Sequence, residues 1–180
     1  MRVITLLLTA LLLTSCAGVP DSIKPVNNFE LSKYTGQWYE IARLDHRFER
    51  GLEKVTATYS INPDGSVRVK NKGFSSKSNE WEEATGKAKF YSDQNIGHLE
   101  VSFFGPFYGS YVIFYLDKEA YQYAFVTGSE NSLWLLSRTP KVSDKLKKEF
   151  IRQVTDAGYD TDELIFVKQA PWVLLKHHRR

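Results

Sequence analysis

Eight short runs of β-favouring residues, each closed by turn-forming residues, constrain this chain more than any other feature. We predict strands at residues 37–44, 54–61, 66–73, 80–90, 98–104, 110–116, 121–127 and 132–138. The connections between them are short and carry turn chemistry, as in Asn62-Pro63-Asp64-Gly65. Strands joined in this way can pair in sequence order, and closing such a meander removes its exposed edges. The sequence therefore predicts an all-β fold, an eight-stranded antiparallel up-and-down barrel.

Apolar and polar residues alternate within these runs, which assigns one face of each strand to the interior. In Val55-Thr56-Ala57-Thr58-Tyr59 the apolar residues are the odd-numbered ones. The residues expected to line the interior are Val55, Ala57, Tyr59, Val69, Asn71, Ala84, Val101, Phe103 and Trp134. The pattern leaves two alternatives open: a hollow that holds one small ligand, or a core filled by its own side chains.

One helix is expected after the last of the eight strands, at about residues 143–157. Ser143 is a candidate N-cap, and Gly158 is a candidate stop signal. Leu146, Phe150 and Val154 share one face of this helix, so it should pack on the barrel wall. A short ninth strand is expected at residues 164–167.

Residues 1–15 are expected to be a lipoprotein signal peptide. The apolar run from Val3 to Leu13 is shorter than the roughly twenty residues of a membrane span. Leu13-Thr14-Ser15-Cys16 resembles the lipobox of bacterial lipoproteins, in which the cysteine becomes the lipidated N-terminus. Two or more acyl chains anchor a protein stably, so we expect a membrane anchor at Cys16. Because Ala17 rather than Asp follows, the resemblance implies a lipid-anchored protein of the Gram-negative outer membrane, on its periplasmic face.

The remainder of the chain divides into three parts. Residues 16–28 are expected to be the lipidated N-terminus and a spacer, since Pro20 and Pro25 interrupt any periodicity. Residues 29–170 form one folded domain, and residues 171–180 form a basic tail.

Composition excludes several classes of partner. The 24 basic and 21 acidic residues give a net charge of +3, which is no argument for nucleic acid, and a single cysteine excludes an internal disulfide. The four histidines fall on loops, strand starts or the tail, and no His, Cys, Asp or Glu grouping has metal-ligand spacing. We expect no metal, no cofactor and no catalytic residue.

Gly36-Gln37-Trp38 resembles the Gly-x-Trp signature that opens the first strand of lipocalins. Lipocalins share the order of eight strands, an arginine at the end of the eighth, a helix and a final strand. If strands alternate up and down, Trp38, Asp117 and Arg138 fall at one end of the barrel. A guanidinium over an indole contributes about 0.5–2 kcal/mol. The resemblance assigns Gly36, Trp38 and Arg138 to structural closure of that end.

Residues 26–29, 45–55 and 101–109 are similar to the bacterial lipocalins of Gram-negative outer membranes. That resemblance implies storage or transport of fatty acids or lysophospholipids for envelope maintenance under stress, and a homodimer. It also adds Val112 and Phe114 to the lining residues, because residues 111–115 are apolar at every position and their alternation cannot be read.

Two functions of other classes stay open. Some lipocalin folds are enzymes that act on a lipid, and a filled barrel would be a structural lipoprotein without ligand.

We predict that Cys16→Ser releases the protein from the membrane into the periplasm, because the anchor is lost. Fractionation of cells measures this, and Ala17→Asp, which keeps the cysteine and favours the inner membrane, is the matched control. Membrane-bound Cys16→Ser protein would reveal a second anchor.

Overall fold

The computed structural model describes residues 19–129 and 131–169. The expectations for the signal peptide, for Cys16 and for the basic tail at residues 171–180 lie outside the described residues.

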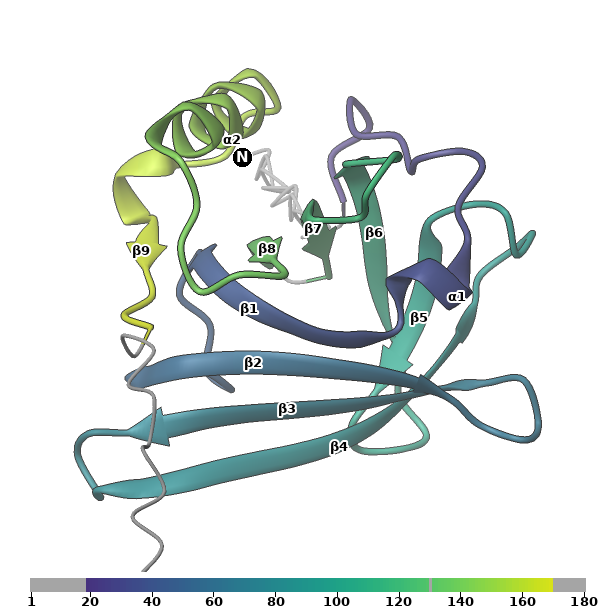
Figure 1. The fold of residues 1–180 in the computed structure, drawn as a ribbon, viewed down its shortest axis with the longest axis horizontal. Helices are drawn as coiled ribbons and strands as arrows, with labels where there is room; N and C mark the ends of the chain where they lie inside the picture. Colours follow the sequence, from purple (N-terminus) through teal and green to yellow (C-terminus); the bar gives the residue numbers. More distant parts are fainter. Residues whose placement is uncertain (1–18, 130, 170–180) are drawn as a thin grey trace, which may run out of the picture.

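Eight antiparallel strands close into a barrel, as the sequence predicts (Figure 1). Every predicted strand is present, and the observed ends differ from the predicted ones by two residues at most. Each strand pairs with its sequence neighbours, and β1 also pairs with β8, which completes the ring. The strands are β1 (Gly36–Arg43), β2 (Leu52–Ile61), β3 (Val67–Ser75), β4 (Glu80–Phe90), β5 (His98–Ser102), β6 (Gly109–Leu116), β7 (Tyr123–Gly128) and β8 (Leu133–Ser137).

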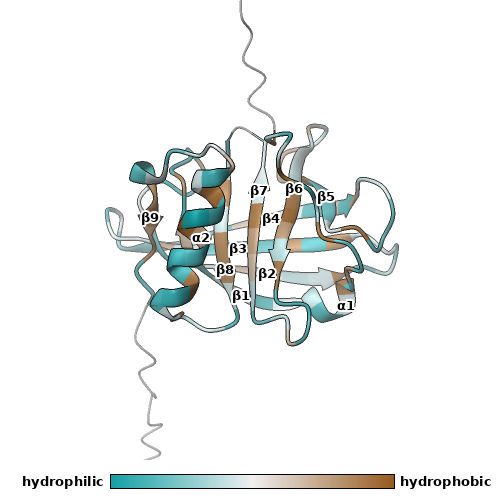
Figure 2. Cartoon of the chain, turned by 90° about the horizontal axis from the view of Figure 1, so that it is seen from above, coloured by the Kyte–Doolittle hydropathy of each residue, from teal (hydrophilic) through white to brown (hydrophobic). Residues whose placement is uncertain are grey.

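The expected helix is α2 (Asp144–Asp156), and it begins where the sequence places its cap. The Ser143 side chain accepts a hydrogen bond from the Leu146 backbone N–H, which satisfies a donor of the first turn. Phe150 and Val154 are buried against the outer barrel wall, and the face seen in Figure 2 is mainly hydrophilic. Within the described residues, no helix has the length and apolar character needed to cross a bilayer.

Two short helical turns are not predicted from the sequence. These are α1 (Leu31–Tyr34), which precedes β1, and the 3-10 turn η1 (Thr161–Glu163). Both are too short to show a helical period.

The ninth strand, β9 (Ile165–Phe166), fills a seam in the barrel wall. β2 pairs with β1 only over Gly36–Tyr39, and β9 pairs with Ala42 and Arg43 where β2 has diverged. Just beyond β9, the Gln169 side-chain amide donates to the backbone carbonyls of Glu40 (2.7 Å) and Val55 (2.9 Å). The C-terminal segment is therefore part of the wall between β1 and β2.

The described part of the predicted spacer packs along the barrel. The Val26 backbone N–H donates to the Ile113 carbonyl at 2.8 Å, and the Gly97 N–H donates to the Val26 carbonyl at 2.9 Å. Ile23 is buried in the outer apolar cluster. Residues 19–25 are thus held to the outside of β5 and β6, and Val26 packs against the inner cluster, although the sequence of this segment shows no strand period.

The apolar residues form one cluster inside the barrel and a second outside it. The prediction that Val112 and Phe114 face the interior is wrong, because both pack in the outer cluster. Tyr111 and Ile113 occupy the inner cluster instead. β6 is apolar on both faces because α2 and residues 19–25 cover its outer side, and a register shift between Ile113 and Tyr115 further obscures its alternation.

The end of the barrel that contains Trp38 is closed by Arg138. The Arg138 guanidinium carbon lies 3.8 Å from the centroid of the Trp38 ring. Gly36 has a φ of +92°, and a Cβ there would come within 3.4 Å of the guanidinium. The guanidinium also donates to the backbone carbonyls of Lys33, Thr35, Gln37 and Tyr121. We call this the closed end, and the opposite end the mouth.

We predict that Arg138→Ala lowers the free energy of unfolding by about 2–4 kcal/mol, because four hydrogen bonds and the stacking on Trp38 are lost. Urea titration followed by tryptophan fluorescence measures this. Arg152→Ala, which removes exposed ion pairs on α2, is the control and should change stability by at most about 1 kcal/mol. An equal loss in both variants would contradict the closure role.

Candidate functional site

The inner wall of the barrel opens toward the mouth. Along β4 the inward residues are Ala88, Gly86, Ala84 and Glu82, which stand opposite inward positions of β3. Ala88 and Gly86 are buried, whereas Ala84 and Glu82 are exposed. Solvent therefore reaches the inner face in the mouth half and is excluded from the closed half.

The hydrogen-bond ladder between β4 and β5 covers only a short part of β4. β3 pairs with β4 from Glu80 to Ala88, but β5 pairs with β4 only from Lys87 to Phe90. Phe103, just after β5, lies against Gly86, where a Cβ would come within 2.9 Å of its ring. The mouth half of the inner wall is thus bounded by long β3 and β4 on one side and by the β5–β6 loop on the other (Figure 1).

Three tyrosines form a polar floor under this open half. The Tyr111 hydroxyl lies 2.8 Å from the hydroxyls of both Tyr34 and Tyr59. Burial raises the pKa of all three phenols, so they remain neutral and hydrogen-bond each other. We call these residues the tyrosine floor, below which Trp38 and other apolar side chains fill the barrel.

Five residues near the mouth form a second polar group, which we call the mouth cluster: Glu40, Arg43, His46, Glu49 and Trp134. The Arg43 guanidinium donates to Glu40 Oε1 at 2.7 Å and to the Glu49 backbone carbonyl at 2.8 Å. Glu49 Oε2 accepts from Trp134 Nε1 at 3.1 Å and lies 2.9 Å from His46 Nε2. Glu40, Arg43 and Glu49 are buried. The β1–β2 loop is therefore held to the barrel by a glutamate that it turns inward.

The pKa values of the two glutamates of the mouth cluster are shifted in opposite directions. Burial and the nearby Glu49 carboxylate raise the pKa of Glu40 well above its ordinary value, although Arg43 opposes this. Burial also disfavours the Glu49 anion, but His46, Trp134 and Arg43 together outweigh it and lower the pKa of Glu49. The 2.7 Å contact between Arg43 and Glu40 has the length of an ion pair. Because His46 and Trp134 both bind the Glu49 carboxylate, whereas the Glu40 carboxyl group has Arg43 alone, we assign the charge to Glu49 and the proton to Glu40.

Sequence reasoning missed Glu40 and Arg43 as interior residues. Charged side chains in a half-buried strand are normally assigned to the wet face. The available signal was the spacing: Glu40 follows Trp38 by two residues, and residues two apart share a face of a strand. Arg43 follows a register irregularity between Glu40 and Ala42, which no pattern in the sequence announces.

The other predicted lining residues lie as follows. Ala57, Tyr59 and Val69 are buried in the inner cluster, and Val101, Phe103 and Trp134 are partly buried against it. Val55 is buried beside Gly73, and Asn71 pairs in register with Ala57 and Ala84. The Asn71 Oδ1 atom is buried and has no hydrogen-bond partner. That oxygen is available to a ligand in the mouth half of the barrel.

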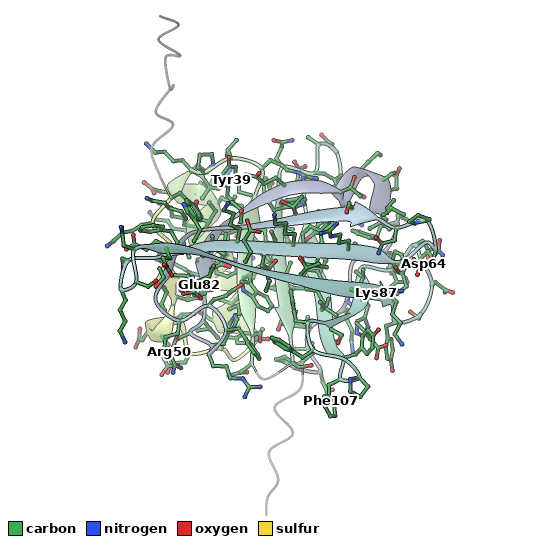
Figure 3. All side chains as sticks on the ribbon, turned by 90° about the horizontal axis from the view of Figure 1, so that it is seen from below. Tyr39, Arg50, Asp64, Glu82, Lys87 and Phe107 are labelled. Carbon is green, nitrogen blue, oxygen red and sulfur yellow. The ribbon has the colours of Figure 1, made fainter. Side chains whose placement is uncertain are left out.

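Two loops meet across the mouth. Phe48 of the β1–β2 loop stacks on Phe104 of the β5–β6 loop, with ring centroids 6.1 Å apart. Both rings are exposed, as is Phe107, which projects from the body of the molecule in Figure 3. We call Phe48, Phe104 and Phe107 the aromatic tip.

A groove of about 960 Å³ lies on the outside of the barrel, between α2 and the strands. Tyr115, Tyr123 and Leu146 contribute its apolar surface, and Lys145 and Arg152 lie at its border. It is separated from the inner wall of the barrel by the strands, so it is distinct from the solvent-accessible inner surface above the tyrosine floor.

Residues 29–169 match a family model described as a lipocalin-like domain. The chain belongs to the lipocalin family. This lipocalin is 54% identical over 170 residues to the outer membrane lipoprotein Blc of Vibrio cholerae. The matched region covers 94% of this chain and 99% of the relative. It is 48% identical over 163 residues to the protein of that name in Escherichia coli, with coverage of 89% and 92%.

Solved structures support the same fold. Insecticyanin from Manduca sexta superimposes with a TM-score of 0.69 at 20% identity, covering 85% of this lipocalin and 87% of the insect protein. The family and its barrel confirm the resemblance drawn from Gly36, Trp38 and Arg138. This lipocalin is an outer membrane protein, as its relatives from Gram-negative bacteria are, and this confirms the expected location.

We predict that Arg43→Met lowers the free energy of unfolding by about 3–5 kcal/mol, because it removes the buried guanidinium that bonds the Glu40 carboxyl group and the Glu49 backbone carbonyl and that, together with His46, stabilises the Glu49 anion. Glu40→Gln should cost at most about 1 kcal/mol near pH 5, since the amide replaces a protonated acid. Urea titration of both variants measures the difference, and equal losses would contradict the charge assignment.

The same variants give a pH dependence with a definite sign. Above pH about 4.5 unfolded Glu40 releases its proton while folded Glu40 retains it, so its raised pKa makes wild-type stability fall as pH rises. Glu40→Gln lacks this loss. Its stability relative to wild type should therefore increase between pH 5 and pH 8, and a constant difference would show that the pKa of Glu40 is not raised.

Proposed function

We propose that this lipocalin binds a lipid with a single long acyl chain, a fatty acid or a lysophospholipid, in the hollow between the tyrosine floor and the mouth. It stores or transports that lipid for maintenance of the envelope under stress. The observation that carries the proposal is the inner wall of the mouth half, where Ala84, Phe103 and Trp134 are solvent-accessible although their faces point into the barrel.

Family membership supports a small hydrophobic ligand, and the hollow suits an acyl chain. Each buried methylene contributes about 0.8 kcal/mol, and association costs at least about 4 kcal/mol. A dissociation constant near 1 μM corresponds to about 8 kcal/mol, so roughly fifteen methylenes must leave water. The ligand must therefore carry a long acyl chain.

The polar end of the ligand would lie at the mouth. The tyrosine floor closes the deep end with neutral hydroxyls that already hydrogen-bond each other. His46 and Arg47 belong to the loop at the opening, whereas Asn71 Oδ1 on the inner wall is an acceptor that cannot bond a carboxylate or a phosphate. This arrangement favours entry of the acyl chain first, with a carboxylate or phosphate left at the opening.

We propose binding rather than catalysis. The described residues contain no group of three His, Cys, Asp or Glu that could hold a metal ion. His98 lies on the outside of the barrel, where it stacks on Tyr91 and contacts Ser110 at 2.8 Å, so a lipid in the hollow cannot reach it. His46 is bound by Glu49 in the mouth cluster.

Membrane association through lipidated Cys16 and assembly into a homodimer belong to the same proposal. Mass spectrometry of the membrane-extracted protein tests the lipidation, and sedimentation of the purified protein tests the dimer.

We predict that Ala84→Trp weakens binding of a fluorescent fatty acid at least tenfold, because the indole fills the open half of the inner wall. Displacement titration measures this. Thr85→Trp is the matched control, since Thr85 is the next residue of β4 and faces outward. Equal affinities for both variants would place the ligand elsewhere, and conversion of the bound lipid, followed by mass spectrometry, would support the enzyme alternative.

A further inference from the structure

We propose that the aromatic tip docks on the bilayer that holds the lipid anchor, so that the barrel mouth faces the membrane. The inference rests on the proposed function in one respect, the lipidation of Cys16. It goes beyond that function because it assigns an interaction surface and an orientation to the folded domain.

The aromatic tip exposes large apolar side chains where the fold gains little from them. Phe48 is 57% exposed, Phe104 is 67% exposed and Phe107 is 81% exposed. All three belong to loops at the mouth, and the stacking of Phe48 on Phe104 groups two of them. A group of exposed apolar side chains of this kind marks an interaction site, and aromatic rings favour the boundary between headgroups and acyl chains.

The charges around the aromatic tip suit a lipid surface that carries negative charge. The Arg47 guanidinium lies 4.6 Å from the centroid of the Phe48 ring, and Arg50 bonds Asp45 at 2.7 Å. Glu49, the other acid of this loop, is turned into the mouth cluster and is 7% exposed. The inward turn of Glu49 therefore leaves the outer surface of the loop with more positive than negative charge.

The attachment point of the anchor lies at the same end of the barrel. Residues 19–25 line a groove that runs along the outside of the barrel between Tyr91 and His98, toward the closed end, and Ser110 and Ser129 at the mouth. Because Val26 bonds Gly97, which precedes β5 on the closed-end side, the chain runs toward the mouth as it approaches Val19. Ser110 begins β6 at the mouth, and its backbone N–H donates to Ser129 Oγ in the loop after β7. Cys16 precedes Val19 by three residues, a distance of at most about 10 Å along the chain. A lipidated Cys16 therefore holds the mouth, rather than the closed end, near the bilayer.

Docking in this orientation places the opening of the hollow against the lipid surface. An acyl chain could then move between the bilayer and the barrel under the aromatic tip without crossing water. The closed end, with Arg138 over Trp38, would point away from the membrane.

The test uses full-length lipidated protein in vesicles of phosphatidylethanolamine and phosphatidylglycerol. A nitroxide is attached in Phe107→Cys, where the lipidated Cys16 sulfur is blocked, and in Tyr91→Cys as the matched control. Tyr91 is 62% exposed and follows β4 at the closed end. We expect the ratio of oxygen to nickel-complex collisions to rise at least threefold at position 107 on reconstitution and to stay unchanged at position 91.

Three outcomes overturn the proposal. In the first, both labels stay in water. In the second, the label at position 107 is shielded and couples to a second label, which would show a contact between two copies. Protein whose Cys16 carries no lipid in mass spectrometry would remove the anchor argument and with it the orientation.

A second measurement separates docking from binding. Phe104→Ser combined with Phe107→Ser should slow transfer of a fluorescent fatty acid from vesicles to the protein about tenfold, while its equilibrium affinity in solution stays the same. Ile61→Ser combined with Tyr91→Ser, at the closed end, should change neither quantity. If neither the wild type nor any variant binds the fluorescent fatty acid, the proposed function is refuted. The docking measured by the labels would not be refuted by that result.

Discussion

One guanidinium joins the segments that must meet for the barrel to close. Arg138 binds the carbonyls of Lys33, Thr35 and Gln37, which precede it by 105, 103 and 101 residues. Its guanidinium also covers the ring of Trp38. This contact fixes the start of β1 against the end of β8. Because that end is filled and closed, solvent reaches the interior from the opposite end, and the candidate site lies between the tyrosine floor and that end.

The interior has three levels that differ in chemistry. Apolar side chains fill the closed end, the tyrosine floor crosses the middle, and the mouth cluster lies on one wall of the open half. Burying ionic groups gives no clear gain in stability over an apolar wall. Here the buried groups have another effect, since Arg43 and Glu49 hold the β1–β2 loop in place over the opening. The barrel thus positions the β1–β2 loop, which turns some of its side chains inward and exposes others.

The sequence predicted the fold more completely than the site. Alternation and turn chemistry located all eight strands, and Ser143 marked the start of α2. Alternation did not show which side chains of β6 face inward, because both faces of this strand are covered, and Val112 points away from the interior. Register shifts, such as the one between Glu40 and Ala42, change which residues face the interior, and the amino-acid composition does not reveal them. Arg43 escaped prediction for this reason, and Glu40 escaped it because a charged residue in a strand is normally expected to face water.

The seam filled by β9 and Gln169 has a consequence for the order of folding. β1 lies near the start of the chain, yet its edge beside β2 is completed only by residues near the end. The wall therefore cannot be finished until residues 165–169 have been synthesised. Contacts of such long sequence separation form slowly, since a large loop must close before they contribute. A shortened chain that stops before residue 165 would still contain all eight strand sequences but would leave the seam between β1 and β2 open.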